Sequence, residues 1–375
     1  MSVPKRSTGV APDVSAARLV NQHLAKPILG TAAEVVSILG AVQAQDYASA
    51  KWGIAQRTVG ATDADVEKEI SDAKILRTHI LRPTWHFVAA ADVRWMLELT
   101  APRVRAAVGS YDRKLGIDAD VRRKTRAILS QALRGSNHLT RLELAKELSN
   151  GGVHAEGTQL LAHLIMHAEL DGLVCSGVRR GKQFTYALVD ECVPATRYLM
   201  RDAALQKLAT TYFRTRGPAT EDDFAWWSGL TKADAKAAVR TVEGLESEAI
   251  KGKTYWYSTL GALSKQPVVR LLPSYDEYLV SYRDRSAIQK RVDPVKVGEK
   301  FDFLGSYVII LNGQIVGRWA RSVSADVVAI TLQPFVRLSR FELDAVEAQA
   351  NRYSQFLGLP LRLEMAKRKA ATRRL

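Results

Sequence analysis

Two glutamines and an aspartate stand close together near the start of the chain, in the run Gln43-Ala44-Gln45-Asp46. A glutamine amide is neutral, but its carbonyl accepts hydrogen bonds and its NH2 group donates them, so two amides can position a water molecule. Their carbonyls can also place the negative ends of dipoles beside a positive charge that develops during a reaction. Asp46 adds a carboxylate that can activate water as a general base. These three residues are the candidate catalytic group.

Their spacing restricts the backbone that can present them. Residues i and i+2 point about 200° apart around a helix, so Gln43 and Gln45 can face one substrate only at a helix end or in extended backbone. The flanking residues Gly40 and Asp46 permit such a break. Two simpler interpretations stay open, namely two solvated amides at an ordinary helix end, and an Asp46 that caps a helix beginning near Tyr47.

The elements around this group repeat in one order along the chain. Residues 136–189 predict two helices, the second at Glu156–Leu170, and then two short strands that a basic turn joins. Helix, turn, helix and basic hairpin is the order of a winged helix. The order returns after residue 195, where a helix at Ala195–Arg216 precedes two shorter helices and a hairpin ending at Tyr257.

A further copy is predicted at the N-terminus, with the glutamines inside it. Its helices are expected to start at Ser15, Thr31, Tyr47 and Asp63, and its strands to be Ile75–Ile80 and Trp85–Ala89. After residue 262 the pattern changes to longer strands, with Asn312-Gly313 as a strong hairpin signal. The elements expected there are strands at Ser306–Leu311, Gln314–Ala320 and Val327–Leu332, and a helix at Arg340–Phe356.

We therefore expect an α+β protein that is mainly α. Three tandem winged-helix units would form a concave DNA-binding surface, and a small mixed α/β domain would follow them. The expected units are 1–117, which contains the Gln-x-Gln element, 118–194 and 195–262, with the β-rich domain and a basic tail at 263–375.

The charge of the chain favours a polyanionic partner. The sequence has 54 Lys and Arg against 39 Asp and Glu, which leaves a net charge of +15. Much of this excess lies between Arg103 and Arg134 and in the tail from Arg362. Clustered cations bind phosphates together by releasing condensed counterions, whereas scattered ones keep a protein soluble. Tandem units with basic hairpin tips favour double-stranded DNA, and the residues expected to contact it are Arg82, Thr84, His86, Arg122, Arg123, Lys124, Arg179, Arg180, Lys182, Lys251 and Lys253.

Other classes of protein are disfavoured. Only two cysteines, Cys175 and Cys192, are present, which excludes a disulfide framework or zinc knuckle and fits a reducing cytoplasm. No run of residues is apolar enough for a signal peptide or a membrane span. No nucleotide-binding glycine loop or serine elbow occurs, so no cofactor is expected. His163 and His167 have metal-pair spacing but no third ligand, so no metal is expected. We expect a monomer.

Several motifs together resemble a known family. Ala41–Asp46, Ala50–Ala55 and Leu81–Phe87 are similar to segments of the bacterial tandem winged-helix DNA glycosylases that confer azinomycin resistance. Leu271–Leu279, Ser281–Arg285 and Asn312–Gly317 resemble later segments of the same family, so the resemblance covers nearly the whole chain.

The resemblance implies an activity and assigns residues to it. These enzymes remove purines alkylated at N7, including one end of an interstrand crosslink, and their catalytic Gln-x-Gln falls on Gln43 and Gln45. A separate branch of the family has an acidic second residue, which this chain lacks. An N7-alkylated purine is positively charged and departs readily, leaving an oxocarbenium-like sugar. Glutamines that position water and supply dipoles are sufficient for such a substrate.

Two other functions remain open from the residues alone. A non-enzymatic winged-helix DNA-binding protein, such as a regulator or an adduct sequestrator, would bind DNA in a salt-dependent way without using either glutamine. A winged-helix scaffold for protein partners would bind DNA weakly despite the charge.

Overall fold

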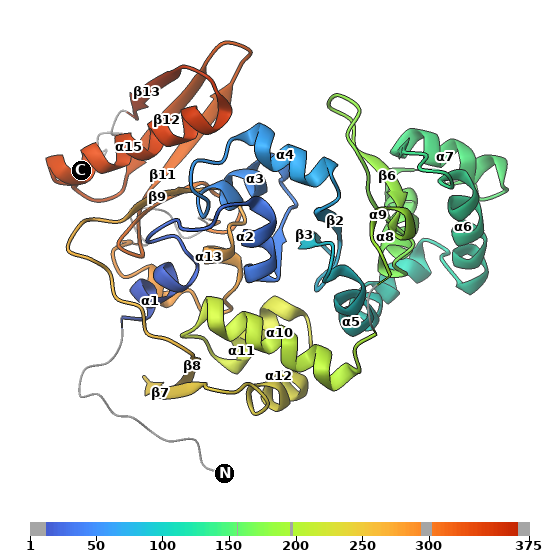
Figure 1. The fold of residues 1–375 in the computed structure, drawn as a ribbon, viewed down its shortest axis with the longest axis horizontal. Helices are drawn as coiled ribbons and strands as arrows, with labels where there is room; N and C mark the ends of the chain where they lie inside the picture. The colour runs from blue at the N-terminus through green and yellow to red at the C-terminus, as the bar shows by residue number, and fades with distance from the viewer. Residues whose placement is uncertain (1–12, 156, 196–197, 294–301, 367–375) are drawn as a thin grey trace, which may run out of the picture.

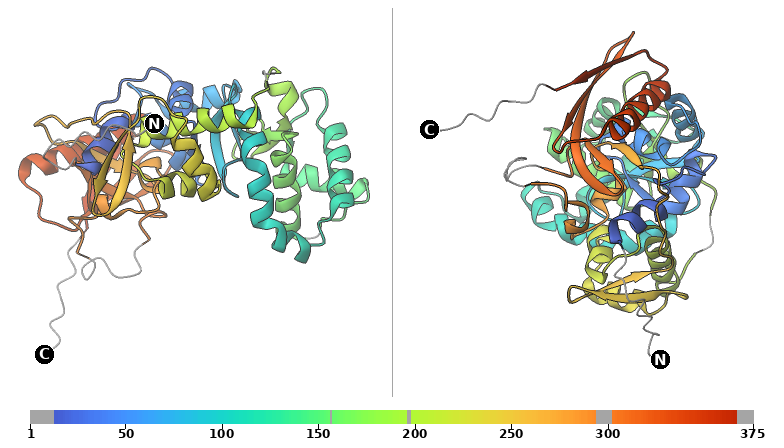
Figure 2. Two further views of the ribbon diagram at one scale, coloured as in Figure 1. Left: turned by 90° about the horizontal axis from the view of Figure 1, so that it is seen from below. Right: turned by 90° about the vertical axis from the view of Figure 1, so that its left-hand side faces the viewer.

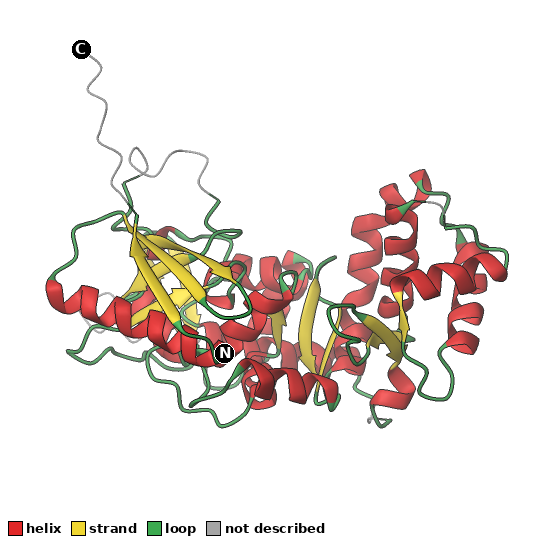
Figure 3. Cartoon of the chain, turned by 90° about the horizontal axis from the view of Figure 1, so that it is seen from above, coloured by secondary structure: helices red, strands yellow, loops and turns green. Residues whose placement is uncertain are grey.

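The computed structural model describes residues 13–155, 157–195, 198–293 and 302–366. It is a mixed α+β fold with more helix than strand (Figure 3). Three groups of helices each carry a small antiparallel sheet or hairpin, and a larger sheet follows (Figure 1). No helix among the described residues combines the length and the apolarity that a membrane span needs.

The first group, residues 14–89, contains the predicted elements. Thr31 and Thr62 begin two of its helices with capping boxes, because each hydroxyl accepts a backbone N–H and an acidic side chain three residues on returns the bond. Its sheet has the order β1-β3-β2. The elements are α1 (Val14–Asn21), α2 (Ala32–Leu39), β1 (Ala41–Gln43), α3 (Tyr47–Ala55), α4 (Asp63–Ser71), β2 (Ile75–His79) and β3 (Trp85–Ala89).

A long helix, α5 (Val93–Lys114), leads to the second group, residues 119–192, which stands at one end of the molecule (Figures 1 and 3). The sequence analysis did not predict α5, which continues through Pro102. The second group has a hydrophobic core of its own and the sheet order β4-β6-β5. Its elements are α6 (Ala119–Ala132), β4 (Leu139–Thr140), α7 (Arg141–Asn150), α8 (Thr158–Leu170), β5 (Val174–Ser176), β6 (Thr185–Leu188) and α9 (Val189–Cys192).

The third group, residues 201–257, packs against the first. Its first helix begins at Arg201 and not at Ala195, because the backbone at Met200 is extended, with φ −57° and ψ 146°. Phe213 and Trp227 share a core with residues of β2, β3 and α5. The elements are α10 (Arg201–Arg216), α11 (Glu221–Ser228), α12 (Lys232–Val239), β7 (Glu246–Ile250) and β8 (Lys253–Tyr257).

The C-terminal part forms a five-stranded sheet in the order β13-β12-β11-β10-β9. Trp52 of the first group contacts Tyr353 and Phe356 of the C-terminal helix at ring-centroid distances of 5.0 and 5.2 Å, and sheet residues such as Leu271 belong to the same core. The C-terminal sheet and helix lie beside the first group (Figure 2). The sequence analysis missed β9, α13 and β13, and the basic tail beyond residue 366 lies outside the described residues. The elements are β9 (Val269–Leu272), α13 (Glu277–Val280), a 3-10 turn (Ser286–Ile288), β10 (Val308–Leu311), β11 (Gln314–Val323), β12 (Val328–Pro334), α15 (Arg340–Leu357) and β13 (Leu361–Met365).

Candidate functional site

Gln43 and Gln45 lie between the end of a strand and the start of a helix. Gln43 is the last residue of β1 and pairs with His86 of β3, and the ladder continues as the Ala44 N–H donates to the Trp85 carbonyl at 2.7 Å. Gln45 is exposed in the short connection to α3, where its Oε1 accepts from the Trp85 N–H at 3.4 Å. This agrees with the expectation that the pair requires extended backbone or a helix end.

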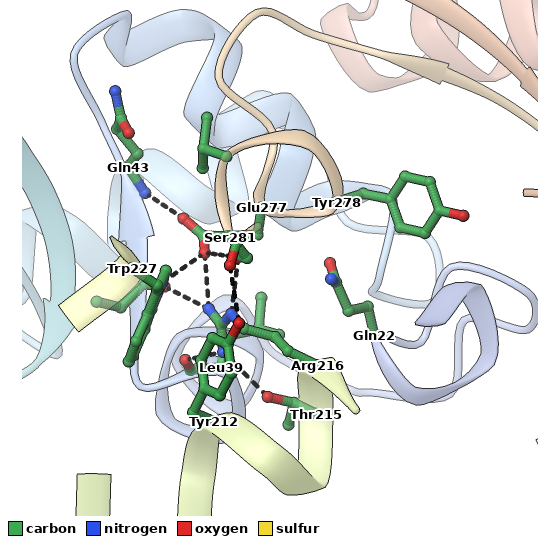
Figure 4. A network of polar contacts seen from close by, with 12 residues as sticks. Gln22, Leu39, Gln43, Tyr212, Thr215, Arg216, Trp227, Glu277, Tyr278 and Ser281 are labelled. Carbon is green, nitrogen blue, oxygen red and sulfur yellow. Dashed lines mark hydrogen bonds and ion pairs between the residues drawn. The ribbon is translucent and has the colours of Figure 1, made fainter. Parts of the chain in front are cut away.

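A buried carboxylate far along the chain holds the backbone of Gln43. The Gln43 N–H donates to Glu277 Oε1 of α13 at 2.9 Å (Figure 4). Glu277 Oε2 accepts from Arg216 at 2.7 Å, from the Trp227 indole at 3.0 Å and from the Ser281 hydroxyl at 2.7 Å. The C-terminal part and the third group thus meet directly behind β1.

Arg216 and Glu277 form an ion pair with no exposed surface on either side chain. Burial alone would raise the pKa of Glu277, but the charge of Arg216 and the hydrogen bonds from Arg216, Gln43 and Ser281 lower this pKa to about 2. Arg216 also donates to the carbonyls of Leu39 at 2.8 Å and Ala41 at 3.2 Å, which fixes the turn from α2 into β1. Gly40, with a φ of +77°, makes that turn.

The side chain of Gln43 is held by Arg82. Gln43 is only 8% exposed, and its Oε1 accepts from Arg82 Nη2 at 2.8 Å. The half-buried guanidinium of Arg82 has a pKa below its usual range. Burial lowers this pKa most, the positive charges of Arg285 and Arg216 lower it further, and the negative charge of Glu277 raises it only in part. The sequence analysis expected Arg82 to contact DNA; the structure brings it to the catalytic candidate.

Asp46 caps α3, as the simpler interpretation of the sequence had it. Its Oδ1 accepts from the Ser49 N–H at 3.1 Å, and its Oδ2 accepts from the hydroxyls of Ser49 at 2.7 Å and Tyr307 at 3.2 Å. Burial raises the pKa of Asp46, but the Ser49 hydrogen bonds and the charge of Arg321 lower it below the usual value. A carboxylate so engaged is a weak base, so its catalytic role stays a prediction.

His86 does not reach the surface, so the predicted contact between its ring and DNA does not fit the structure. Its side chain is completely buried, and Nδ1 lies 2.9 Å from the Thr84 carbonyl. Burial and the neighbouring charge of Arg82 lower the pKa of His86 to about 3, which keeps the ring neutral. Thr84 itself is half-buried in the loop that carries Arg82.

The other predicted cations differ in how they are engaged. Arg123 and Lys124 pair with Asp120 on α6, Arg180 pairs with Glu143, and Lys253 donates to Asp284 at 2.6 Å. Arg122 is half-buried, and Lys182 and Lys251 are exposed. Their contact with DNA stays a prediction.

Arg179 joins two groups of the fold. Its guanidinium carbon lies 5.1 Å from the centroid of the Tyr47 ring and 5.2 Å from that of Phe184, and Nη1 lies 3.6 Å from a Glu67 carboxylate oxygen. The hairpin of the second group therefore packs on Tyr47 at the start of α3 and on Glu67 of α4. Arg179 is a cation between two aromatic rings and not a free hairpin tip.

The sequence analysis missed Glu277, Arg216 and Trp226. Trp226 is 42% exposed, and the guanidinium carbons of Arg82 and Arg285 lie 6.0 and 5.4 Å from its ring centroid. Adjacent residues on a helix point about 100° apart, and the structure shows that Trp227 is the one that is fully buried. His163 and His167 are bound to Asp112 at 2.8 and 2.9 Å, which explains their spacing without a metal.

Comparison with known proteins identifies the class. The model of a family described as DNA glycosylase AlkZ-like matches residues 36–356. The interstrand DNA cross-link repair glycosylase of Streptomyces sahachiroi is 24% identical over 373 residues, covering 93% of this chain and 98% of that protein. The solved structure of the Streptomyces sahachiroi DNA glycosylase AlkZ has a TM-score of 0.73 at 23% identity and covers 94% and 98% of the two chains.

The family match extends over most of the chain and includes both glutamines. This chain belongs to the AlkZ-like family of DNA glycosylases.

Proposed function

We propose that this protein is a DNA glycosylase that hydrolyses the N-glycosidic bond of N7-alkylated purines in double-stranded DNA. Bulky adducts and interstrand crosslinks are among its substrates. The observation that carries the proposal is the position of the two glutamines, Gln43 at the end of β1 and Gln45 in the connection to α3, with the backbone of Gln43 fixed by the buried Glu277. Membership of a glycosylase family supports it.

The chemistry suits neutral side chains. Alkylation at N7 makes the purine a good leaving group, so the enzyme need only hold a water and stabilise an oxocarbenium-like sugar. The exposed amide of Gln45 can hold the water, and the low pKa of Asp46 makes that carboxylate a weak competitor as a base. Amides are weak catalysts, so unmodified purines should not be released.

The duplex is bound electrostatically. We propose that the three helix–hairpin groups are winged-helix units, at 1–117, 118–194 and 195–262, with the C-terminal part at 263–375. Their cations contact phosphates, and the protein acts as a monomer in the bacterial cytoplasm. The residues proposed for these contacts are Arg122, Arg123, Lys124, Arg180, Lys182, Lys251 and Lys253. Salt should weaken binding steeply.

The test is release of free base from duplexes that contain N7-methylguanine or a bulky N7-alkylguanine, followed by alkaline cleavage at the abasic site. The wild type and the control Gln355→Ala, which changes an exposed glutamine on α15, should release base. Gln45→Ala should slow release by about 10²-fold or more, the usual effect of removing one stabilising group. Salt-dependent binding with no abasic product from either duplex would instead indicate a non-enzymatic DNA-binding protein.

A further inference from the structure

The loop between β2 and β3, residues 80–84, begins with two buried residues, Ile80 and Leu81, and Pro83 is exposed further along it. Leu81 is 1% exposed, has a φ of +63°, and its N–H donates to the Thr100 hydroxyl at 3.2 Å. The turn after α11 presses against it, because a Cβ built on Gly229 would lie 2.1 Å from the Leu81 carbonyl oxygen. His86 secures the other end through the Thr84 carbonyl. The backbone of this loop is therefore fixed from three sides.

The loop directs one charged side chain at Gln43. Arg82 Nη2 donates to Gln43 Oε1 at 2.8 Å, and the guanidinium carbon lies 6.0 Å from the centroid of the Trp226 ring. A guanidinium has donors only, so the amide of Gln43 must turn its carbonyl toward Arg82. The NH2 group of Gln43 then points elsewhere, and no acceptor for it is seen among the residues that the structure describes.

We infer that Arg82 is a positioning residue that sets the orientation of the Gln43 amide, and not a contact to a DNA phosphate. This inference rests on the proposed function for its meaning in catalysis. The inference gives Gln43 and Gln45 different roles in catalysis. Gln43 offers an N–H donor to an acceptor atom of the substrate. The amide of Gln45 is exposed, and its contact with the Trp85 N–H is long, at 3.4 Å, so this amide can exchange that contact to hold water.

The two roles of Arg82 predict different kinetics. A phosphate contact contributes to affinity and to the salt dependence of binding, about 0.9 in the slope of log K against log salt for each phosphate. A positioning residue contributes to the rate constant of the bound complex and acts only through Gln43. Its loss should therefore have little further effect once Gln43 has been removed.

The experiment measures single-turnover base release at saturating enzyme, and duplex affinity at several salt concentrations, for Arg82→Ala, Arg82→Lys, Gln43→Ala and the double variant Arg82→Ala/Gln43→Ala. Arg340→Ala, on the exposed side of α15, is the matched control. We expect Arg82→Ala to lower the rate constant about tenfold or more with an unchanged salt slope. We expect the double variant to equal Gln43→Ala and Arg82→Lys to restore part of the rate. An unchanged rate constant with a smaller salt slope, or effects that multiply in the double variant, would overturn the inference.

A second readout does not depend on activity, and so separates this inference from the proposed function. In protein labelled with 15N at its glutamines, the side-chain NH2 signals of Gln43, identified by their loss in Gln43→Ala, should shift in Arg82→Lys while those of Gln355 stay in place. Unshifted Gln43 signals would overturn the inference even if the wild type releases base. If the Gln43 signals shift in Arg82→Lys but the wild type releases no base, the inference about the orientation of Gln43 stands and the proposed function is refuted.

Discussion

The substitution Glu277→Gln tests the buried network that holds the catalytic strand. Glu277 accepts hydrogen bonds on both carboxylate oxygens, from the Gln43 N–H on Oε1 and from Arg216, Trp227 and Ser281 on Oε2. A glutamine has the same shape but only one accepting oxygen. In Glu277→Gln, the NH2 group of the new side chain faces a hydrogen-bond donor in either orientation of the amide. Arg216 also becomes a buried charge without a counter-ion.

The expected loss is large because no water reaches the pair. Removing one partner of a buried ion pair destabilises a protein by about 3–5 kcal/mol. The pKa of Glu277 gives the pH dependence: since it is about 2 in the folded protein against an ordinary value of 4.5, the carboxylate stabilises the fold above pH 4.5. That contribution is lost as the pH falls from 4.5 toward 2. The difference between wild type and variant should shrink over the same range.

Urea unfolding followed by circular dichroism measures the free energy of unfolding of both proteins. Asp72→Asn, which breaks the exposed pair between Lys68 and Asp72, is the control and should change it far less. Arg216→Met should cost much less in the Glu277→Gln background than in the wild type. A loss for Glu277→Gln no larger than that for Asp72→Asn would refute the assignment of Glu277 as the support of β1.

Three further predictions concern other parts of the molecule. The pKa of His86 is about 3 in the folded protein against an ordinary value of 6.5. As the pH falls, the unfolded chain therefore binds the proton first, and the wild type should lose about 2 kcal/mol of stability between about pH 7 and pH 5. Urea unfolding of His86→Asn should show no such loss of unfolding free energy between about pH 7 and pH 5. The same pH dependence in the wild type and in His86→Asn would contradict the burial argument. Gly229→Ala should destabilise by about 1–3 kcal/mol more than Gly244→Ala, because both glycines have positive φ but only the first meets a carbonyl at 2.1 Å; equal melting temperatures would argue against the close contact. Replacing the three cations at 122–124 by glutamine should reduce the salt slope of duplex binding by up to about 2.7, and an unchanged slope would remove α6 from the DNA-binding surface.

Local signals explain what the sequence could predict. A threonine cap with an acidic residue three positions later marks the start of α2, α4, α7, α11 and α12. Each of these helix starts can therefore be predicted from four consecutive residues. The restriction on Gln43 and Gln45 is equally local, because it follows from the helical repeat. Asp46 was proposed as a base, with a helix cap left open as the alternative, and the structure shows the cap at the start of α3.

Long-range contacts explain what could not be predicted from the sequence. Glu277 and Gln43 are 234 residues apart, and nothing near either residue indicates that they meet. The partner of Arg82 depends on how the β2–β3 loop is enclosed by the third group, so a basic hairpin turn was interpreted as a phosphate contact. Hydrophobicity alone does not tell which of the adjacent Trp226 and Trp227 faces inward, and only Trp227 does.

The most direct measurement is the single-turnover rate constant for base release from a duplex with one N7-alkylguanine, at saturating protein, for wild type, Gln43→Ala, Gln45→Ala and Gln355→Ala. The account predicts release by the wild type and by Gln355→Ala at the same rate, with each of the other two slower by about 10²-fold or more at unchanged duplex affinity. Equal rates for all four proteins, or no release by the wild type, would contradict it.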